Sequence, residues 1–244
     1  MPIVKLRRKQ TLHFSGDSLR LVYFPITAIF SVVSVLQDGT STEVGLVGNE
    51  GMAGLPAFLG APSDPFEIVV HVEGTAYRVS ADRLREAAHK SDHLQALLLR
   101  YAQSFMNQLA QGTACRGHHL VRQRLARLLL MIRDGSSTDR FPMTHEYLGQ
   151  MLGVGRPSVT IAAASLRDSN LITYNRGGII ITDGPGLEDA ACECYRIVRD
   201  EYNRLFHLDA PPACPAATHG VKRAGAPPRA PRPAMTRSDQ CSRH

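Results

Sequence analysis

The sequence predicts an α+β protein in which two folded parts are joined by one long helix. Short β-branched runs separated by glycine and proline fill residues 3–77. A helix–turn–helix pattern followed by a hairpin occupies residues 141–183, and apolar residues at coiled-coil spacing lie between these two parts. We therefore expect an antiparallel sheet domain over residues 1–90, a dimerisation helix over 91–113, a winged helix-turn-helix domain over 114–206 and a disordered tail over 207–244.

The N-terminal part is expected to be a small antiparallel barrel or sandwich. The segment from Gln37 to Thr40 is a strong turn signal, and it predicts a hairpin between residues 28–36 and 43–47. Residues 66–72 and 75–79 are expected to form the last strand pair. The run from Leu21 to Leu36 is uncharged over 16 residues but is too short for a membrane span, contains Pro25 and is rich in β-branched residues. Strands explain it, and no membrane partner is expected.

A short helix is expected from Ser80 to His89, and a longer one from Asp92 to about Gly112. Apolar residues of the longer helix step by four, three and four, which is the spacing of a coiled-coil seam. This pattern predicts pairing with a second copy of the chain, although packing on the helix's own domain would give the same pattern. The predicted dimer interface is Leu94, Leu98, Tyr101 and Phe105.

The next helix is expected from His118 to Arg133, with four aliphatic residues directed inward. Four arginines lie elsewhere on or near it and could contact phosphate or only solvate a face. The inward residues are Leu125, Leu128, Leu129 and Ile132. The arginines are Arg116, Arg122, Arg124 and Arg127.

The helix-turn-helix is predicted from its capping residues. Thr144 suits an N-cap, the segment from Gly153 to Gly155 suits a sharp turn, and Pro157 suits the first position of a second helix. The buried side of the second helix is expected to carry Val159, Ala163 and Leu166.

The outward N-terminal turns of that second helix are the predicted contact surface for double-stranded DNA. The fork of an arginine side chain matches the O6 and N7 acceptors of guanine, so Arg156 is the leading candidate for reading a base. The turn of the hairpin and the start of the first helix would add further contacts. The predicted DNA-binding residues are Arg156, Pro157, Ser158, Thr160, Ile161, Thr144 and Arg176.

Metal and catalytic sites are not expected. The five cysteines are odd in number and no secretory signal is present, which fits a reducing cytoplasm. A closing helix over residues 186–206 would carry Cys192 and Cys194 two positions apart, so that their thiols diverge. No CxxC motif, nucleophile–base pairing or phosphate loop occurs, so the protein is not expected to be an enzyme.

The net charge of +6 suggests an acidic partner, but most of the excess lies after residue 206. That tail is rich in proline and alanine and has no aromatic residue after Phe206, so it cannot build a core.

The order of elements resembles the Crp/Fnr family of bacterial transcription regulators. The resemblance covers about Leu12 to Phe206 and is carried by MTHEYLGQMLGVGRPSVT, by the hairpin and by GNEGMAGLPAFLGAP. It implies that residues 1–90 form a β-roll sensor domain like those that bind cyclic nucleotides. It also implies a homodimer that binds a two-fold symmetric DNA site and acts on RNA polymerase. The family usually carries a further helix and strand before the position of Ile3, and a truncated start site would explain their absence.

The signature residues for the family's ligands are missing. Met52 stands where cyclic-nucleotide-binding members have a glutamate, and Glu67 lies near the expected phosphate-binding arginine. The first cysteine is Cys115, so the N-terminal iron–sulfur cysteines are absent. The cofactor is therefore unknown. The segment that either lines a pocket or serves as a structural turn contains the candidate ligand-binding residues Gly48, Gly51, Met52, Ala53 and Gly54.

On the second helix, the family's guanine-reading set is only partly present. Arg156 matches its first arginine, but Pro157 replaces the glutamate and Ile161 the second arginine. DNA binding is expected to survive, with a different target sequence. The alternative is a small-molecule-binding module whose winged helix contacts a protein.

Overall fold

The computed structural model of the protein describes residues 1–136, 138–175 and 178–206. The strands are β1 (Ile3–Leu6), β2 (Thr11–His13), β3 (Leu21–Pro25), β4 (Ile29–Val35), β5 (Ser41–Val47), β6 (Glu67–Val72), β7 (Gly74–Ser80), β8 (Arg140–Phe141), β9 (Ile172–Asn175) and β10 (Gly178–Ile181). The helices are α1 (Leu55–Phe58), α2 (Ala81–His89), α3 (Asp92–His118), α4 (Val121–Ser136), α5 (His145–Leu152), α6 (Arg156–Asp168), α7 (Gly184–Ala190) and α8 (Cys194–Phe206).

Two antiparallel sheets form the N-terminal sheet domain, in the strand orders β2-β6-β4-β5 and β1-β7-β3. The predicted β4–β5 hairpin is confirmed, with Phe30 opposite Val47. The predicted pairing of β6 with β7 is wrong, because the two strands belong to different sheets. Only Glu73 separates them, and at Gly74 the chain passes so close to its neighbours that a Cβ would lie 2.5 Å from the Ala28 nitrogen. The uncharged run from Leu21 to Leu36 forms β3 and β4, as expected.

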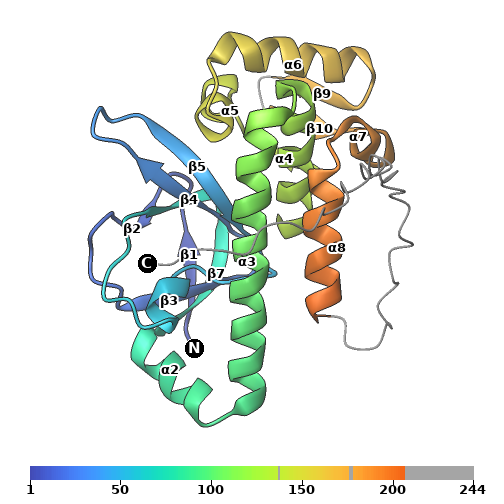
Figure 1. The fold of residues 1–244 in the computed structure, drawn as a ribbon. Coiled ribbons are helices and arrows are strands. Elements are labelled where there is room, and N and C mark those ends of the chain that lie inside the picture. Colours follow the sequence, from blue (N-terminus) through green and yellow to red (C-terminus); the bar gives the residue numbers. More distant parts are fainter. Residues whose placement is uncertain (137, 176–177, 207–244) are drawn as a thin grey trace, which may run out of the picture. The chain divides into compact units, whose positions relative to one another are not determined.

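Helix α3 begins with the Ser91 side chain accepting a hydrogen bond from the Leu94 N–H, and it runs to His118, past the predicted end near Gly112. It lies between the sheets and α8 (Figure 1). Leu98 and Tyr101 are buried against residues of the sheet domain such as Met52, and the Tyr101 hydroxyl donates to the Met52 carbonyl at 3.0 Å.

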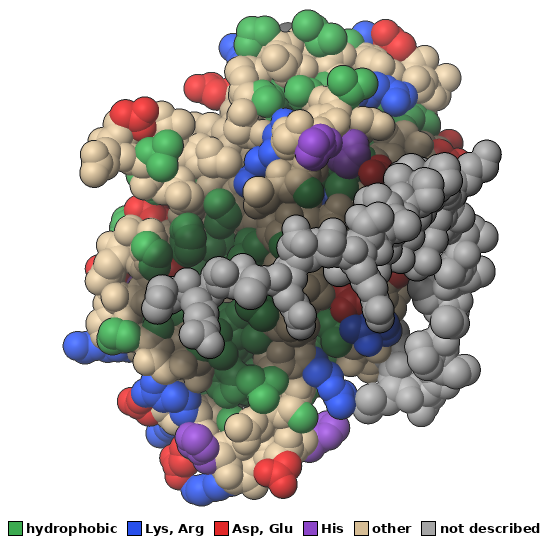
Figure 2. All heavy atoms as spheres, viewed as in Figure 1, with side chains coloured by type: hydrophobic (Ala, Val, Ile, Leu, Met, Phe, Trp, Pro, Cys, Tyr) green, Lys and Arg blue, Asp and Glu red, His purple; other side chains and the backbone are tan. Residues whose placement is uncertain are grey.

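The predicted dimer seam is therefore wrong. Leu98 and Tyr101 are buried in the chain's own core, and Leu94 and Phe105 pack against the same core from partly buried positions. Another side of α3 is open: Leu99 and Met106 are 49% and 55% exposed. Figure 2 shows hydrophobic side chains gathered over this face of the molecule. Both sides of α3 are apolar, so periodicity alone could not say which one meets the sheet domain.

The C-terminal domain is built on a core around α4 that also includes Ile29, Leu46 and Val72 of the sheet domain. The predicted inward residues Leu125, Leu128, Leu129 and Ile132 are all buried. The hairpin β9–β10 forms as expected, and β8 adds a third strand through Phe141 opposite Ile179. No helix in the described part of the chain is both long and apolar enough to cross a bilayer.

The predicted closing helix over residues 186–206 is wrong, because the structure has two helices, α7 and α8, with an extended break between them. Cys192 lies in the break and Cys194 begins α8, so their thiols do not diverge along one helix. Instead, they face Cys115 and His119 of α3, and the four potential ligand atoms lie within 4.8 Å of one another. The tail over residues 207–244, for which disorder was predicted, lies outside the described residues.

Candidate nucleic-acid interface

Helix α5 and the turn after it form as their capping residues predict. The Thr144 hydroxyl accepts a hydrogen bond from the Tyr147 N–H at 3.2 Å, which confirms the N-cap. Gly153 ends the helix in the left-handed region at φ 63°, where glycine carries no steric cost. A Cβ at Gly149 would lie 2.8 Å from the Val154 carbonyl oxygen, so the turn folds back against a glycine of the helix itself.

Helix α6 follows with one buried and one open face. Val159, Ala163 and Leu166 are buried, as predicted. The open face begins at the first turn of the helix, where Pro157 sits. Ile161 is 72% exposed on this face. The residues exposed on this N-terminal half are Arg156, Pro157, Ser158, Thr160 and Ile161.

His145 connects the two helices to the hairpin, and sequence reasoning missed it. Its Nδ1 lies 3.0 Å from the Thr160 hydroxyl, and its ring centroid lies 4.4 Å from that of Tyr174. The Thr160 hydroxyl donates to the Arg156 carbonyl at 3.1 Å, so we assign the His145 Nδ1 as the donor to Thr160. Burial, followed by the charge of Arg156, lowers the pKa of His145 and favours this neutral form. Thr160 is thus a supporting residue as well as an exposed one.

The hairpin β9–β10 is the wing from which a further contact with DNA is predicted. Strands β9 and β10 flank the turn, but Arg176 lies outside the described residues, so its contact with DNA stays a prediction. Gly178, the first residue of β10, has φ 118° and lies so close to β8 that a Cβ would meet the Phe141 carbonyl oxygen at 2.0 Å. That close approach fixes the hairpin beside α5.

Two of the four arginines near α4 donate to backbone carbonyls of other elements, and a third, Arg122, donates to the Ser169 hydroxyl at 3.5 Å. The Arg116 guanidinium donates to the Glu43 carbonyl of the sheet domain, and the Arg124 guanidinium donates to the Leu152 carbonyl at the end of α5. Carbonyls at the end of a helix lack partners within it, so Arg124 satisfies one of them. These two arginines connect elements, a role that neither alternative from the sequence included.

The glycine-rich segment of the sheet domain is mostly filled by the protein itself. Met52 and Ala53 are buried in the core, and a Cβ at Gly51 would overlap the ring of Tyr101. Gly54 takes φ 94° before α1, which requires its lack of a side chain. Of the candidate ligand-binding residues, these four therefore behave as structural ones, in agreement with the reading of the segment as a turn.

The comparison with known families gives two matches that together cover most of the described chain. Residues 3–91 match the cyclic nucleotide-binding domain, and residues 123–190 match the Crp-like helix-turn-helix domain. This chain belongs to the Crp/Fnr family of transcription regulators.

Named relatives agree with this assignment of the Crp/Fnr chain. It is 24% identical to the global nitrogen regulator of Nostoc sp. over 74% of this chain and 85% of the relative. It is 27% identical to the transcriptional regulator LdrP of Thermus thermophilus, over 77% and 95% of the two chains. The structure of FixK2 from Bradyrhizobium japonicum superposes with a TM-score of 0.67 at 15% identity, covering 78% of this chain and 97% of that one.

Gly48, the remaining candidate of this Crp/Fnr protein's glycine-rich segment, borders a cavity of about 410 Å³. The cavity lies where the sheet domain, α3, α4 and α8 meet. Its polar lining includes the Glu50 carboxyl, whose pKa is raised because it is buried. Tyr202 of α8 closes one side and donates to the Glu50 carbonyl at 3.0 Å. The expectation that the protein binds no cyclic nucleotide stays a prediction.

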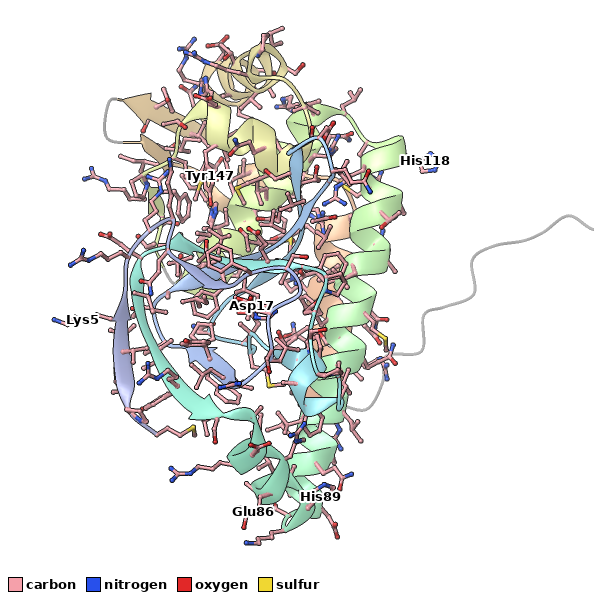
Figure 3. The ribbon with its side chains drawn as sticks, turned by 90° about the vertical axis from the view of Figure 1, so that its left-hand side faces the viewer. Lys5, Asp17, Glu86, His89, His118 and Tyr147 are labelled. Carbon is pink, nitrogen blue, oxygen red and sulfur yellow. The ribbon has the colours of Figure 1, made fainter. Side chains whose placement is uncertain are left out.

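A buried contact joins the sheet domain to α5 in this Crp/Fnr chain. His71 of β6 is 1% exposed, and its Nδ1 lies 2.9 Å from the Tyr147 hydroxyl. The two rings stack at 5.1 Å, and the Arg8 guanidinium lies 5.3 Å above the Tyr147 ring. Figure 3 labels Tyr147. Burial, with a smaller contribution from Arg8, lowers the pKa of His71 to about 3. Nearby, burial raises the pKa of Glu43 to about 8, although the Ser31 hydroxyl donates to it at 2.6 Å.

We expect this contact to make the Crp/Fnr protein sensitive to acid. The unfolded chain binds a proton at His71 below about pH 6.5, whereas the folded chain does so only near pH 3. Stability from His71 is therefore present above pH 6.5 and is lost as the pH falls through this window, by at most about 1.4 kcal/mol per pH unit. Urea unfolding at several pH values should show a shallower acid loss for His71→Gln than for the wild type. Glu43 titrates in both proteins, so its contribution to the pH dependence cancels when the two profiles are compared. Parallel profiles would contradict the assignment.

Proposed function

We propose that the protein binds a two-fold symmetric operator as a homodimer, with the N-terminal half of α6 in the major groove. The observation that carries the proposal is the open face of α6, which presents Arg156, Ser158 and Ile161 beside a hairpin. A second helix of this motif enters the groove with its N-terminal residues toward the base edges.

The side chains of this face suit different parts of the duplex. Arg156 provides the donors that match guanine, and Ile161 provides an apolar surface of the kind that contacts the methyl group of thymine. Ser158 can donate to a base or a phosphate. The Thr144 hydroxyl accepts from the Tyr147 N–H and keeps its own hydrogen, so it can donate to a phosphate at the start of α5. Pro157 sets the start of α6 and reads no base.

The dimer is proposed to form through the open side of α3. Leu99, Gln103, Met106, Ala110 and Thr113 are all exposed, and they step by four, three, four and three. This is the heptad spacing that allows two helices to pair along their length. Pairing of two α3 helices about a two-fold axis would present two α6 helices to two half-sites.

The alternative function, a module whose winged helix contacts a protein, is not favoured by the family of the relatives. We further propose that the protein acts as a regulator without catalysing a reaction. It would contact RNA polymerase, as the family resemblance implies. It would act in the cytoplasm, where its DNA partner is found.

The salt dependence of the binding affinity distinguishes a DNA-binding regulator from a module whose winged helix contacts a protein. DNA fragments that bind the full-length protein should be isolated and sequenced, and the recovered duplex titrated at increasing salt. If the dimer neutralises six or more phosphates, its affinity should fall by roughly 1,000-fold or more between 50 and 200 mM salt. No enrichment of any DNA sequence, together with an affinity that is independent of salt, would overturn the proposal.

A further inference from the structure

Four side chains that are typical metal ligands meet where α3 ends. Cys115 lies in the last turn of α3, and His119 is the C-cap residue of this helix, whose N–H donates to the Cys115 carbonyl. Cys192 and Cys194 approach that face from the break between α7 and α8. The Cys115 and Cys192 sulfurs are 3.5 Å apart, and the Cys194 sulfur lies 3.4 Å from the Nδ1 of His119. All three cysteines are buried and unpaired by disulfides.

These distances fit the corners of a tetrahedron around a single ion. With Zn–S and Zn–N bonds of about 2.3 and 2.0 Å, sulfurs of one zinc site lie about 3.8 Å apart and sulfur and nitrogen about 3.5 Å. An iron–sulfur cluster spreads its ligands over several irons, which would separate some of them beyond the 4.8 Å seen here. We propose that Cys115, His119, Cys192 and Cys194 bind one Zn²⁺ ion.

The surroundings orient the ligands as a zinc site requires. The Nε2 of His119 lies 3.1 Å from a carboxylate oxygen of Glu193, so this nitrogen donates to Glu193 and leaves the Nδ1 lone pair facing the sulfurs. The Gln111 side-chain amide donates to the Cys194 sulfur at 3.1 Å. Such a donor stabilises a thiolate that already holds a metal.

The helix break supplies a second, independent observation. Residues 191–193 contain neither glycine nor proline, yet the chain is extended at Ala191, with φ −76° and ψ 163°. Local sequence therefore gives no reason for α7 to stop. The break turns Cys192 away from the direction it would have in a continuous helix and places its sulfur beside that of Cys115.

Charge also favours an occupied site. Three thiolates, one neutral imidazole and one Zn²⁺ carry a net charge of −1. Cys115 borders a small cavity that also receives the side chains of Arg116, Arg124 and Arg127, which can balance that charge. The ion would join α3 to a segment 77 residues later in the chain and so fix the DNA-binding domain to the end of α3. The assignment does not depend on the proposed function.

Metal content tests the assignment. Protein purified under reducing conditions and analysed by mass spectrometry for metals should contain about one zinc per chain. His119→Ala and Cys192→Ser should lose it, whereas His118→Ala should keep it, because the neighbouring His118 is exposed and points away from the cluster (Figure 3). Circular dichroism checks that each variant folds.

Three further measurements test the assignment even if those variants unfold. His119→Cys supplies a fourth thiolate and should retain zinc, and Glu193→Gln should bind it roughly 10–100-fold more weakly in a chelator competition. Cobalt added to the metal-free wild type should give the absorption of a tetrahedral thiolate site. The single-zinc assignment would be overturned by a wild type that takes up neither zinc nor cobalt. It would also be overturned by a Cys115–Cys192 disulfide in protein purified under reducing conditions, or by iron with inorganic sulfide at the site.

Discussion

Replacing Met106 with Glu is expected to convert the dimer into folded monomers. Met106 is 55% exposed and lies in the open heptad face of α3. In a dimer its counterpart would face it across the axis, so the substitution would bring two carboxylates together in an apolar seam. A monomer can hold only one half-site, and losing the linked second contact should weaken operator binding by about 10²–10⁴-fold. Sedimentation equilibrium measures the first effect and an operator titration the second.

The same substitution at Leu98 should act differently. Leu98 is 4% exposed and packs in the core that α3 shares with the sheet domain. A glutamate there has no partner, so Leu98→Glu should cost about 3–5 kcal/mol of stability and lower the melting temperature strongly. Met106→Gln, which adds no charge, should remain a dimer. Two results would show that the seam lies on the other side of α3. One is a Met106→Glu protein that stays a stable dimer, and the other is a Leu98→Glu protein that becomes monomeric with an unchanged melting temperature.

The helix-turn-helix was predictable because its signals are local. A capping threonine, a glycine that must adopt positive φ and a proline at the start of a helix each act within a few residues. Thr144 and Gly153 accordingly occupy the positions that the sequence predicts, whereas Pro157 is the second residue of α6 and not the first, because the helix already begins at Arg156. The inward face of α6 followed from the same periodicity.

The errors concern contacts between distant segments. Leu98 and Met106 both fit a seam, and only the position of the sheet domain decides which of them is buried. The pairing of β6 failed for the same kind of reason, since neighbouring strands can enter different sheets. His71 and Tyr147 lie 76 residues apart, and no pattern links them.

The cysteine cluster had a usable local signal. Cys115 and His119 are four residues apart where α3 ends, and this spacing suits two ligands of one metal ion even without a CxxC motif. The contribution of Cys192 and Cys194 was not predictable in this way. Residues 191–193 contain no helix breaker, so the sequence predicts one continuous closing helix.

Arg156→Ala should produce the second large effect, a loss of sequence reading. Arg156 is exposed at the first turn of α6, and its own carbonyl is held by Thr160, which in turn contacts His145. The backbone at this point is therefore fixed while the guanidinium stays free to reach a guanine edge. Loss of such a contact costs about 1–3 kcal/mol on the operator and relaxes the preference at one position of each half-site.

The matched control is Arg167 in the last turn of the same helix. Arg167 is exposed and pairs with Asp168 at 3.0 Å. Eleven residues of helix place it about 16 Å from Arg156, away from the turns that would face the bases. Arg167→Ala should therefore leave operator binding nearly unchanged.

One titration tests the base-reading role of α6 most directly. It compares the affinity of the wild type, Arg156→Ala and Arg167→Ala for operator and for scrambled duplex at one fixed salt concentration. The expected result is a loss of roughly 5–150-fold for Arg156→Ala on the operator, with little change on scrambled DNA. Equal losses on the two duplexes would assign Arg156 to a phosphate and contradict the reading of bases by the start of α6.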